Sequence, residues 1–407
     1  MSFKYKNRLI VTTTPNSLLS AILCLQHLKV EEISKTVLAI SGDFASHSGH
    51  DDYQNSLREL ADMYPWLNII WFTGLRSMLS YHFPETIFPS PLMRRKMNEN
   101  DCKIVQGVIA AAENMYLLSD SIGSSSLGKF TVDELWLEYP DFAVCRLFWR
   151  LLPKARKILY PHASDLQSKY DCTIRQKYAG QYVNSTELLL RSRIREILFA
   201  DPISSDQLRW DEILTLNESP PMGSPIIDCS SQLEENILRA IAQKLPMNRY
   251  QELQNLVSKG EKDNTALLLL GNLGDQYLAE EIMSYKDLIE IILQRQSINT
   301  ILIKAHPRHP QEIYEYISQS LQQIFPCIQF KMLIGYEGMP IELMLPFLHF
   351  CVCIAGWTSV IRTVFNIKKV PIFVGVSRLK PLVYSTTDRK IMFDDFLVSL
   401  ELYAELI

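Results

Sequence analysis

Short apolar runs alternate with longer amphipathic segments along the C-terminal half of the chain. The runs at 265–270, 300–304 and 350–354 have the length and branched side chains of buried strands. Segments long enough for helices, 277–296 and 310–324, lie between them, and further strands (328–332, 370–374) and helices (340–346, 358–366) continue the pattern. This alternation predicts an α/β unit with a parallel sheet.

The N-terminal half has a similar pattern. Strands are predicted at 8–13, 36–40, 68–72, 134–138 and 157–160, and helices from residue 17 and at 53–63, 103–117 and 142–152. A Pro-rich stretch at 218–225 is the clearest linker signal, and helices are expected after it at 231–245 and 247–260. Residues 76–100 fit either a surface loop or helical hairpin, or part of an acceptor groove.

The predicted fold class is therefore α/β and GT-B-like, with two Rossmann-type domains that face a central cleft. The expected N-terminal domain spans 1–225. The expected C-terminal domain spans 226–407, with a last helix that packs back on the N-terminal domain. A chain of 407 residues exceeds what a single core usually supports, which agrees with two domains.

Composition excludes several classes of protein. A net charge of −4 gives no electrostatic case for nucleic-acid binding. The eight cysteines are scattered without CxxC pairs, as in a reduced protein without a zinc site. We see no signal peptide and no apolar run of the roughly 18 residues that a membrane span needs. The expected location is the cytoplasm, and attachment to the inner face of the cytoplasmic membrane is left open.

Polar residues follow the predicted strands of the C-terminal half. Lys304 and His306 come at the end of one strand, and Thr358 and Ser359 follow another, with Glu342 between them in sequence. In open α/β sheets ligands bind at this edge, where cations and helix-start hydroxyls suit a phosphate and a carboxylate suits ribose hydroxyls. This pattern predicts a nucleotide-sugar site, so 226–407 is the expected nucleotide-sugar-binding domain and 1–225 the expected domain on the acceptor side. GxGxxG and GxxxxGK[ST] are absent, which disfavours dehydrogenases and P-loop enzymes.

Three motifs in order carry a family resemblance: Lys-Ala-His-Pro-Arg at 304–308, Pro-Ile-Glu at 340–342 and Trp-Thr-Ser at 357–359. They resemble bacterial sialyltransferases of the polysialyltransferase and lipooligosaccharide sialyltransferase type. The resemblance implies a CMP-linked sialic acid or related nonulosonic acid as donor, no metal and no further cofactor. It also implies an inverting transfer to a hydroxyl of a cell-surface glycan, giving a bacterial surface polysaccharide or lipooligosaccharide.

The same resemblance implies roles for single residues. His306, followed by Pro307, would contact the donor phosphate and stabilise the departing CMP, and Lys304 would approach the phosphate or the cytosine. Glu342 would bind the ribose, and Thr358 with Ser359 would hold the phosphate. A last pair, Gly271 and Asn272, would let the backbone approach the base.

Each of these residues also has a structural alternative. His306 could cap a turn, Lys304 could be solvated, and Glu342 could be a helix-start carboxylate. Thr358 and Ser359 could be an N-cap pair, and Gly271 and Asn272 a plain turn. We interpret Arg308 and His309 as surface residues.

The general base is where the chain departs from the family. The family has an acidic pair followed by Gly after an N-terminal strand, whereas this chain has Pro-His-Ala-Ser-Asp at 161–165. A base is still needed, because a sugar hydroxyl is a poor nucleophile until its proton is being removed. His162 is the first candidate, since its ordinary pKa suits the task. Asp165 is the second, as the base or as the group that orients His162.

This departure keeps two alternatives open. A CDP-glycerol-type glycerophosphotransferase would use one histidine in each domain, as His162 and His306 would provide. A catalytically silent nucleotide-sugar-binding protein would need no base. In each case the expected partner is a nucleotide-linked donor, with a glycan acceptor for the transferase.

Overall fold

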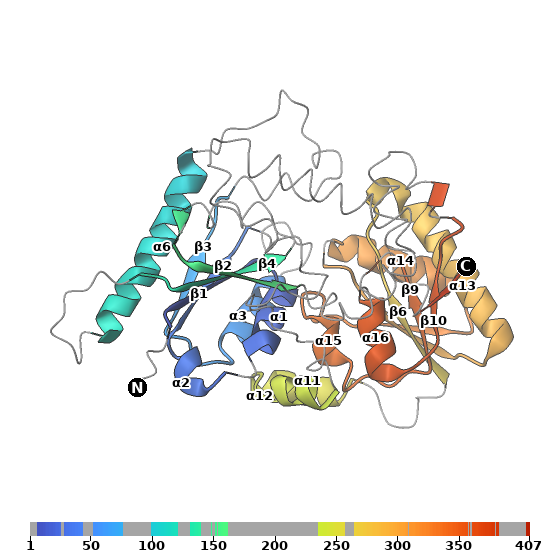
Figure 1. The fold of residues 1–407 in the computed structure, drawn as a ribbon. Helices are drawn as coiled ribbons and strands as arrows, with labels where there is room; N and C mark the ends of the chain where they lie inside the picture. Colours follow the sequence, from blue (N-terminus) through green and yellow to red (C-terminus); the bar gives the residue numbers. More distant parts are fainter. Residues whose placement is uncertain are drawn as a thin grey trace, which may run out of the picture. The chain divides into compact units, whose positions relative to one another are not determined.

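The computed structural model describes residues 6–25, 28–43, 52–75, 99–120, 131–139, 148, 151–152, 154–161, 235–256, 264–307, 309–356, 358, 360–378, 380–381 and 404–407. These residues form two compact α/β units, each built on its own sheet. Figure 1 colours the elements of the chain from blue at the N-terminus to red at the C-terminus.

The first unit has a five-stranded sheet in the order β3-β2-β1-β4-β5. Its strands are β1 (Arg8–Thr12), β2 (Thr36–Ser41), β3 (Asn68–Phe72), β4 (Glu134–Tyr139) and β5 (Arg156–Pro161). Every pairing in it is parallel. The helices in this part of the chain are α1 (Pro15–Leu25), α2 (Val30–Ile33), α3 (Asp52–Ala61) and α6 (Glu99–Asp120).

Both faces of the first sheet are buried along β1, whose successive side chains point to opposite faces. Leu9 and Val11 of β1 lie in a core cluster with Val105 and Ala112 of α6, which covers that face. Ile10, between them in sequence, points to the other face and is also fully buried. This explains why β1 is apolar along most of its length.

An ion cluster around a buried carboxylate lies at the amino edge of the first sheet. Glu134, the first residue of β4, accepts a hydrogen bond from the guanidinium of Arg8 at 3.1 Å and from the ammonium of Lys6 at 2.7 Å. Arg156 lies 3.7 Å from the same carboxylate, and the guanidinium of Arg8 also stacks on Trp136. Burial alone would raise the pKa of Glu134, but Lys6 and Arg8 outweigh it and the pKa is lowered.

The second unit has a six-stranded sheet in the order β11-β10-β9-β6-β7-β8, also parallel in every pairing. Its strands are β6 (Thr265–Leu269), β7 (Thr300–Lys304), β8 (Gln329–Met332), β9 (Val352–Ala355), β10 (Ile372–Val374) and β11 (Glu405–Leu406). Its α-helices are α11 (Glu235–Ala242), α12 (Met247–Gln254), α13 (Leu278–Arg295), α14 (Gln311–Ile324), α15 (Ile341–Met344) and α16 (Ile361–Lys368), and a 3₁₀ turn, η8 (Asp275–Tyr277), precedes α13.

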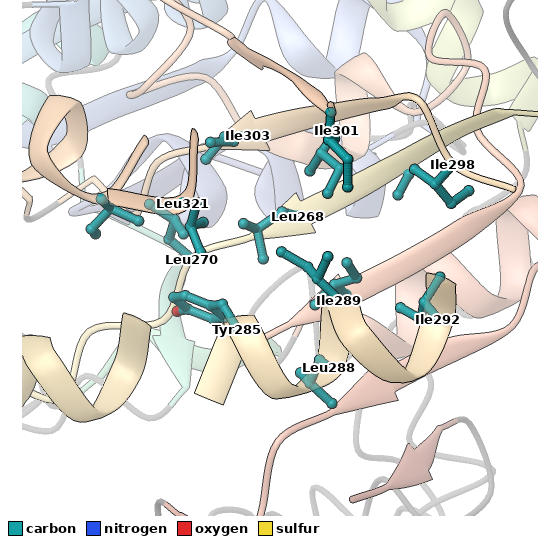
Figure 2. Close-up of a cluster of buried hydrophobic side chains, with 14 of the residues drawn as sticks. Leu268, Leu270, Tyr285, Leu288, Ile289, Ile292, Ile298, Ile301, Ile303 and Leu321 are labelled. Atoms are coloured by element: carbon teal, nitrogen blue, oxygen red, sulfur yellow. The ribbon is translucent and has the colours of Figure 1, made fainter. Parts of the chain in front are cut away.

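Helix α13 covers one face of the second sheet with a stripe spaced as helical packing requires. Tyr285, Leu288 and Ile292 share a core cluster with Leu268 of β6 and Ile301 of β7. Figure 2 shows these side chains of α13 directed at the strands. Towards the N-terminus of the helix the stripe becomes polar, and this end lies at the carboxyl edge of the sheet because α13 follows β6.

The predicted fold class is confirmed in its two Rossmann-type, parallel-sheet α/β units. Most strands and helices agree with prediction to within a few residues, but α12 ends at Gln254 and not at the predicted residue 260. The short α2 and the strand β11 were not predicted. The segment 76–98, the linker at 218–225, most of the helix at 142–152 and the expected last helix lie outside the described residues. In the described part of the chain, no helix is both long and apolar enough to span a membrane.

Candidate functional site

The candidate site lies at the carboxyl edge of the second sheet, where the strand order reverses. The chain passes from β6 to β7 and β8 on one side, then returns to β9 on the other side of β6. In open α/β sheets such a reversal separates the loops that leave neighbouring strands and leaves room for a ligand. The strand ends are level, since Leu269 is paired with both Lys304 and Ala355.

Three polar residues follow these three neighbouring strands. Asn272 comes after β6, His306 after β7 and Thr358 after β9, and each is partly exposed. Because the strands are adjacent and parallel, the loops that carry the three residues leave the sheet at the same edge. An amide, an imidazole and a hydroxyl are thus carried by loops at the carboxyl edge of three neighbouring strands, β7, β6 and β9.

Thr358 lies just before α16. Its hydroxyl accepts a long hydrogen bond, 3.5 Å, from the N–H of Val360, which precedes the helix. A bond of this length is weak, so the hydroxyl is only loosely engaged with the helix start. Ser359 and Trp357, its neighbours in the motif, lie outside the described residues.

Lys304, predicted to reach the ligand, is instead buried and 5% exposed. Its ammonium donates to the carbonyl oxygen of Glu337 at 2.7 Å and to that of Ala305 at 3.3 Å. The alternative of a solvated lysine is therefore wrong. In this conformation Lys304 fastens the 333–340 loop to the end of β7, and a ligand contact remains a prediction.

Glu342, predicted to bind ribose, lies in the first turn of α15 with 0% of its surface exposed. Burial raises the pKa of its carboxyl to about 7, although its own backbone amide and the charge of Lys304 act in the opposite direction. Neither carboxylate oxygen has a well-formed hydrogen bond to another described side chain. Ribose could reach this carboxylate only after the residues that cover it move, so the predicted role stays a proposal.

His309 was interpreted as a surface residue, and this is wrong because it is only 3% exposed. The backbone N–H of His309 donates to the backbone carbonyl of His306 at 3.0 Å and closes a tight turn around Pro307. The two imidazole rings lie 5.9 Å apart. The turn thus directs His309 inwards and leaves His306 and Pro307 partly exposed, while Arg308 lies outside the described residues.

The loop after β6 is held by side chains of α13. Gly271 donates its N–H to the hydroxyl of Tyr285 at 2.9 Å, and Leu273 donates to a carboxylate oxygen of Glu281 at 2.6 Å. Asn272 accepts from the N–H of the following glycine, Gly274, at 3.0 Å with its side-chain oxygen. A φ of +110° at Gly274 suits only glycine, which explains the residue at that turn. The turn expected as the structural alternative is present, and the side chains of Tyr285 and Glu281 hold it in place.

Sequence reasoning missed the anchoring residues Glu281 and Tyr285 and the buried Glu337. Glu281 lies four residues before Tyr285 and seven before Leu288, so it falls within the inward stripe of α13. A carboxylate at a stripe position was the signal that could have identified it. Glu337, by contrast, lies in a loop whose burial has no periodic signature.

The candidate general bases His162 and Asp165 lie outside the described residues, and the last described residue before them is Pro161, which ends β5. The general-base roles of His162 and Asp165 therefore remain predictions.

Comparisons with known proteins do not identify the family. No family model matches the chain, and no curated protein matches it by sequence. Among solved structures, UDP-GlcNAc 2-epimerase from Neisseria meningitidis, bound to UDP-GlcNAc, superposes with a TM-score of 0.44 at 12% identity over 97% of this chain and 92% of the other. A sialyltransferase from Photobacterium damsela gives 0.40 at 12% identity over 98% and 81%. The ADP-heptose LPS heptosyltransferase II of E. coli gives 0.39 at 10% over 99% and 90%. No reaction or substrate follows from likenesses this distant.

Proposed function

We propose that the protein is an inverting glycosyltransferase that moves a sialic acid or related nonulosonic acid from a CMP donor to a hydroxyl of a cell-surface glycan. The observation that carries the proposal is the set of partly exposed polar residues after three neighbouring strands, Asn272, His306 and Thr358. The three sequence motifs that resemble bacterial sialyltransferases support it, since two of them supply His306 and Thr358.

The chemistry needs a group that stabilises the departing phosphate. The acceptor oxygen forms a bond to the anomeric carbon while the bond from that carbon to the CMP oxygen breaks, and CMP leaves with the electron pair. Negative charge grows on the phosphate as this happens, and an imidazolium at His306 would stabilise it. The hydroxyl of Thr358, at the positive end of α16, would donate to the same phosphate.

The proton of the acceptor hydroxyl goes to a general base, for which His162 and then Asp165 remain the candidates. Exclusion of water from the site would limit hydrolysis of the donor. Lys304, Pro307, Glu342 and Ser359 remain proposed donor contacts. The substrates are then the nucleotide sugar and the glycan acceptor.

A decisive test is turnover of CMP-sialic acid by the wild type and by His306→Asn. His349→Asn is the matched control, because His349 is also partly exposed but precedes β9 at the amino edge of the same sheet. We expect His306→Asn to lower the rate by about 100-fold or more and His349→Asn to leave it unchanged. Equal rates for wild type and His306→Asn would contradict the proposal.

A second candidate is transfer of glycerol phosphate from a CDP-linked donor, which the histidine at position 162 in place of an acidic pair favours. The same assay with CDP-glycerol addresses it. Turnover of CDP-glycerol but not of CMP-sialic acid would replace the first proposal. Turnover that is lost in His162→Ala would support an enzyme, whereas tight CMP binding with no turnover of either donor would indicate the silent binding protein.

A further inference from the structure

We propose that Glu281 and Tyr285, two buried polar residues of α13, are positioning residues that hold the loop Gly271–Gly274 ready for the cytosine base. The inference rests on the proposed function, because it assumes a cytidine nucleotide at this edge of the sheet. It adds two residues that none of the sequence motifs includes.

Two backbone N–H groups of the loop are used by α13. Gly271 donates to the hydroxyl of Tyr285 at 2.9 Å, and Leu273 donates to the carboxylate of Glu281 at 2.6 Å. Asn272, between them, is partly exposed, and its side-chain oxygen is used by Gly274. The NH₂ group of Asn272 is therefore the donor that the loop presents outwards. Cytosine offers matching acceptors in its ring nitrogen and carbonyl oxygen.

The anchoring residues occupy positions where a stable helix would carry apolar side chains. Glu281 is 3% and Tyr285 1% exposed, in line with Leu288 and Ile292 further along the stripe. In Figure 2 the hydroxyl of Tyr285 lies beside Leu270, at the end of β6. Burying a carboxylate is costly, and burial raises the pKa of Glu281 to about 7 despite the bond from Leu273. Burial of Glu281 therefore lowers the stability of the unit, while its bond to Leu273 fixes the loop.

The chain after β9 closes the other side of the loop. A Cβ added to Gly356 would lie 2.6 Å from the hydroxyl of Tyr285 and 2.7 Å from the backbone nitrogen of Gly271. Only glycine fits there, and Thr358 follows two residues later. Tyr285 and Gly356 therefore hold the end of β6 and the end of β9 together, so the proposed base contact and the proposed phosphate contact keep a fixed spacing.

The test compares Glu281→Leu, Glu281→Gln and Tyr285→Phe with Glu290→Leu and Glu290→Gln. Glu290 is an exposed glutamate of the same helix that pairs with Lys286. Amide hydrogen exchange of residues 271–274 reports the loop without any ligand. Calorimetry with CMP and with cytidine reports binding, and His306→Asn is included because it should affect only the ligand that carries a phosphate.

We expect Glu281→Leu to speed hydrogen exchange in the loop. It should also lower the affinities for CMP and for cytidine by the same factor, about tenfold, which is the equivalent of one hydrogen bond. Glu281→Gln, which keeps the acceptor, should restore most of the affinity. It should also remove a rise in cytidine affinity as pH increases through 7, since the ionised carboxylate is the stronger acceptor. The Glu290 variants should have the exchange rates and affinities of the wild type, and His306→Asn should lower the affinity for CMP but not for cytidine.

Unchanged exchange at 271–274 in both Glu281→Leu and Tyr285→Phe would overturn the inference whatever the ligand is. Faster exchange with unchanged CMP and cytidine affinities would separate the loop from the base site and also overturn it, while leaving the proposed function standing. A wild type that binds neither CMP nor cytidine would overturn the proposed function itself. If Glu281→Leu does not fold, Tyr285→Phe gives the same comparison with the ring retained.

Discussion

Buried carboxylates lie at opposite edges of the two sheets, in opposite surroundings. Glu134, at the amino edge of the first sheet, is bonded to Lys6 and Arg8, and its pKa is lowered. Glu281 and Glu342, at the carboxyl edge of the second sheet, have pKa values raised to about 7 because burial outweighs their favourable contacts. The first arrangement stabilises the fold, whereas the second destabilises it at neutral pH.

The difference teaches where to look for function. A buried acid with its own cations is explained by structure alone. A buried acid without a bonded cation costs free energy, and such groups cluster at functional sites. The second arrangement coincides with the reversal of strand order and with the partly exposed His306 and Thr358.

The largest loss of stability is expected at Glu134, the carboxylate that is paired with cations. Glu134→Gln should destabilise the first unit by about 3–5 kcal/mol, because it leaves the guanidinium of Arg8 buried without its counter-charge. Since the pKa of Glu134 is lowered, its contribution is present above the ordinary value of 4.5 and is lost as pH falls below it. Urea unfolding combined with hydrogen exchange in β1 and β4 measures this. A loss below 1 kcal/mol at pH 7 would contradict the assignment.

The opposite sign is expected at Glu342. Its raised pKa means that the folded state holds the proton more tightly, so stability falls as pH rises from about 4.5 to about 7. Glu342→Gln should stabilise the second unit at pH 8 by an amount on the order of 1–3 kcal/mol. The gain should shrink towards zero at pH 4.5. Thermal unfolding at both pH values checks this, and a loss of stability at pH 8 would remove the contrast with Glu134.

Gly356→Ala should destabilise the second unit by about 1–3 kcal/mol, the usual range for overpacking. The added methyl group would meet Tyr285 and the backbone of Gly271, and the latter cannot yield without moving the loop. Hydrogen exchange at 271–274 should rise in parallel with the loss of stability. Gly107→Ala is the control, because an added Cβ there meets nothing within 4 Å.

The smallest effect is expected from two buried tyrosines that serve the two sheets in the same way. Tyr116 donates its hydroxyl to the carbonyl of Arg8 in the first unit, and Tyr314 donates to that of Ile303 in the second at 2.6 Å. Each Tyr→Phe change should cost about 1 kcal/mol. Burial raises both pKa values above the ordinary range, so the cost should not vary between pH 5 and 8. A pH-dependent loss at either tyrosine would show that the contrast between the edges is not specific to carboxylates.

The sequence was most informative about the strands. Continuous apolar runs such as 300–304 have few alternatives to a buried parallel strand, and β7 has those bounds. It was less informative about polar side chains, because a strand end specifies an edge and not a direction. Lys304 and His306 are two residues apart, yet one is buried and the other partly exposed. The burial of Glu342 and His309 depends on which segments cover them, and that is decided by contacts distant in sequence.

The central claim is that cytidine monophosphate binds at the carboxyl edge of the second sheet, and a crystal structure with CMP at saturating concentration tests it most directly. We predict the phosphate beside His306 and Thr358 and the base over the loop that Glu281 and Tyr285 hold. CMP bound elsewhere on the chain, or a site at this edge that stays empty, would contradict the claim.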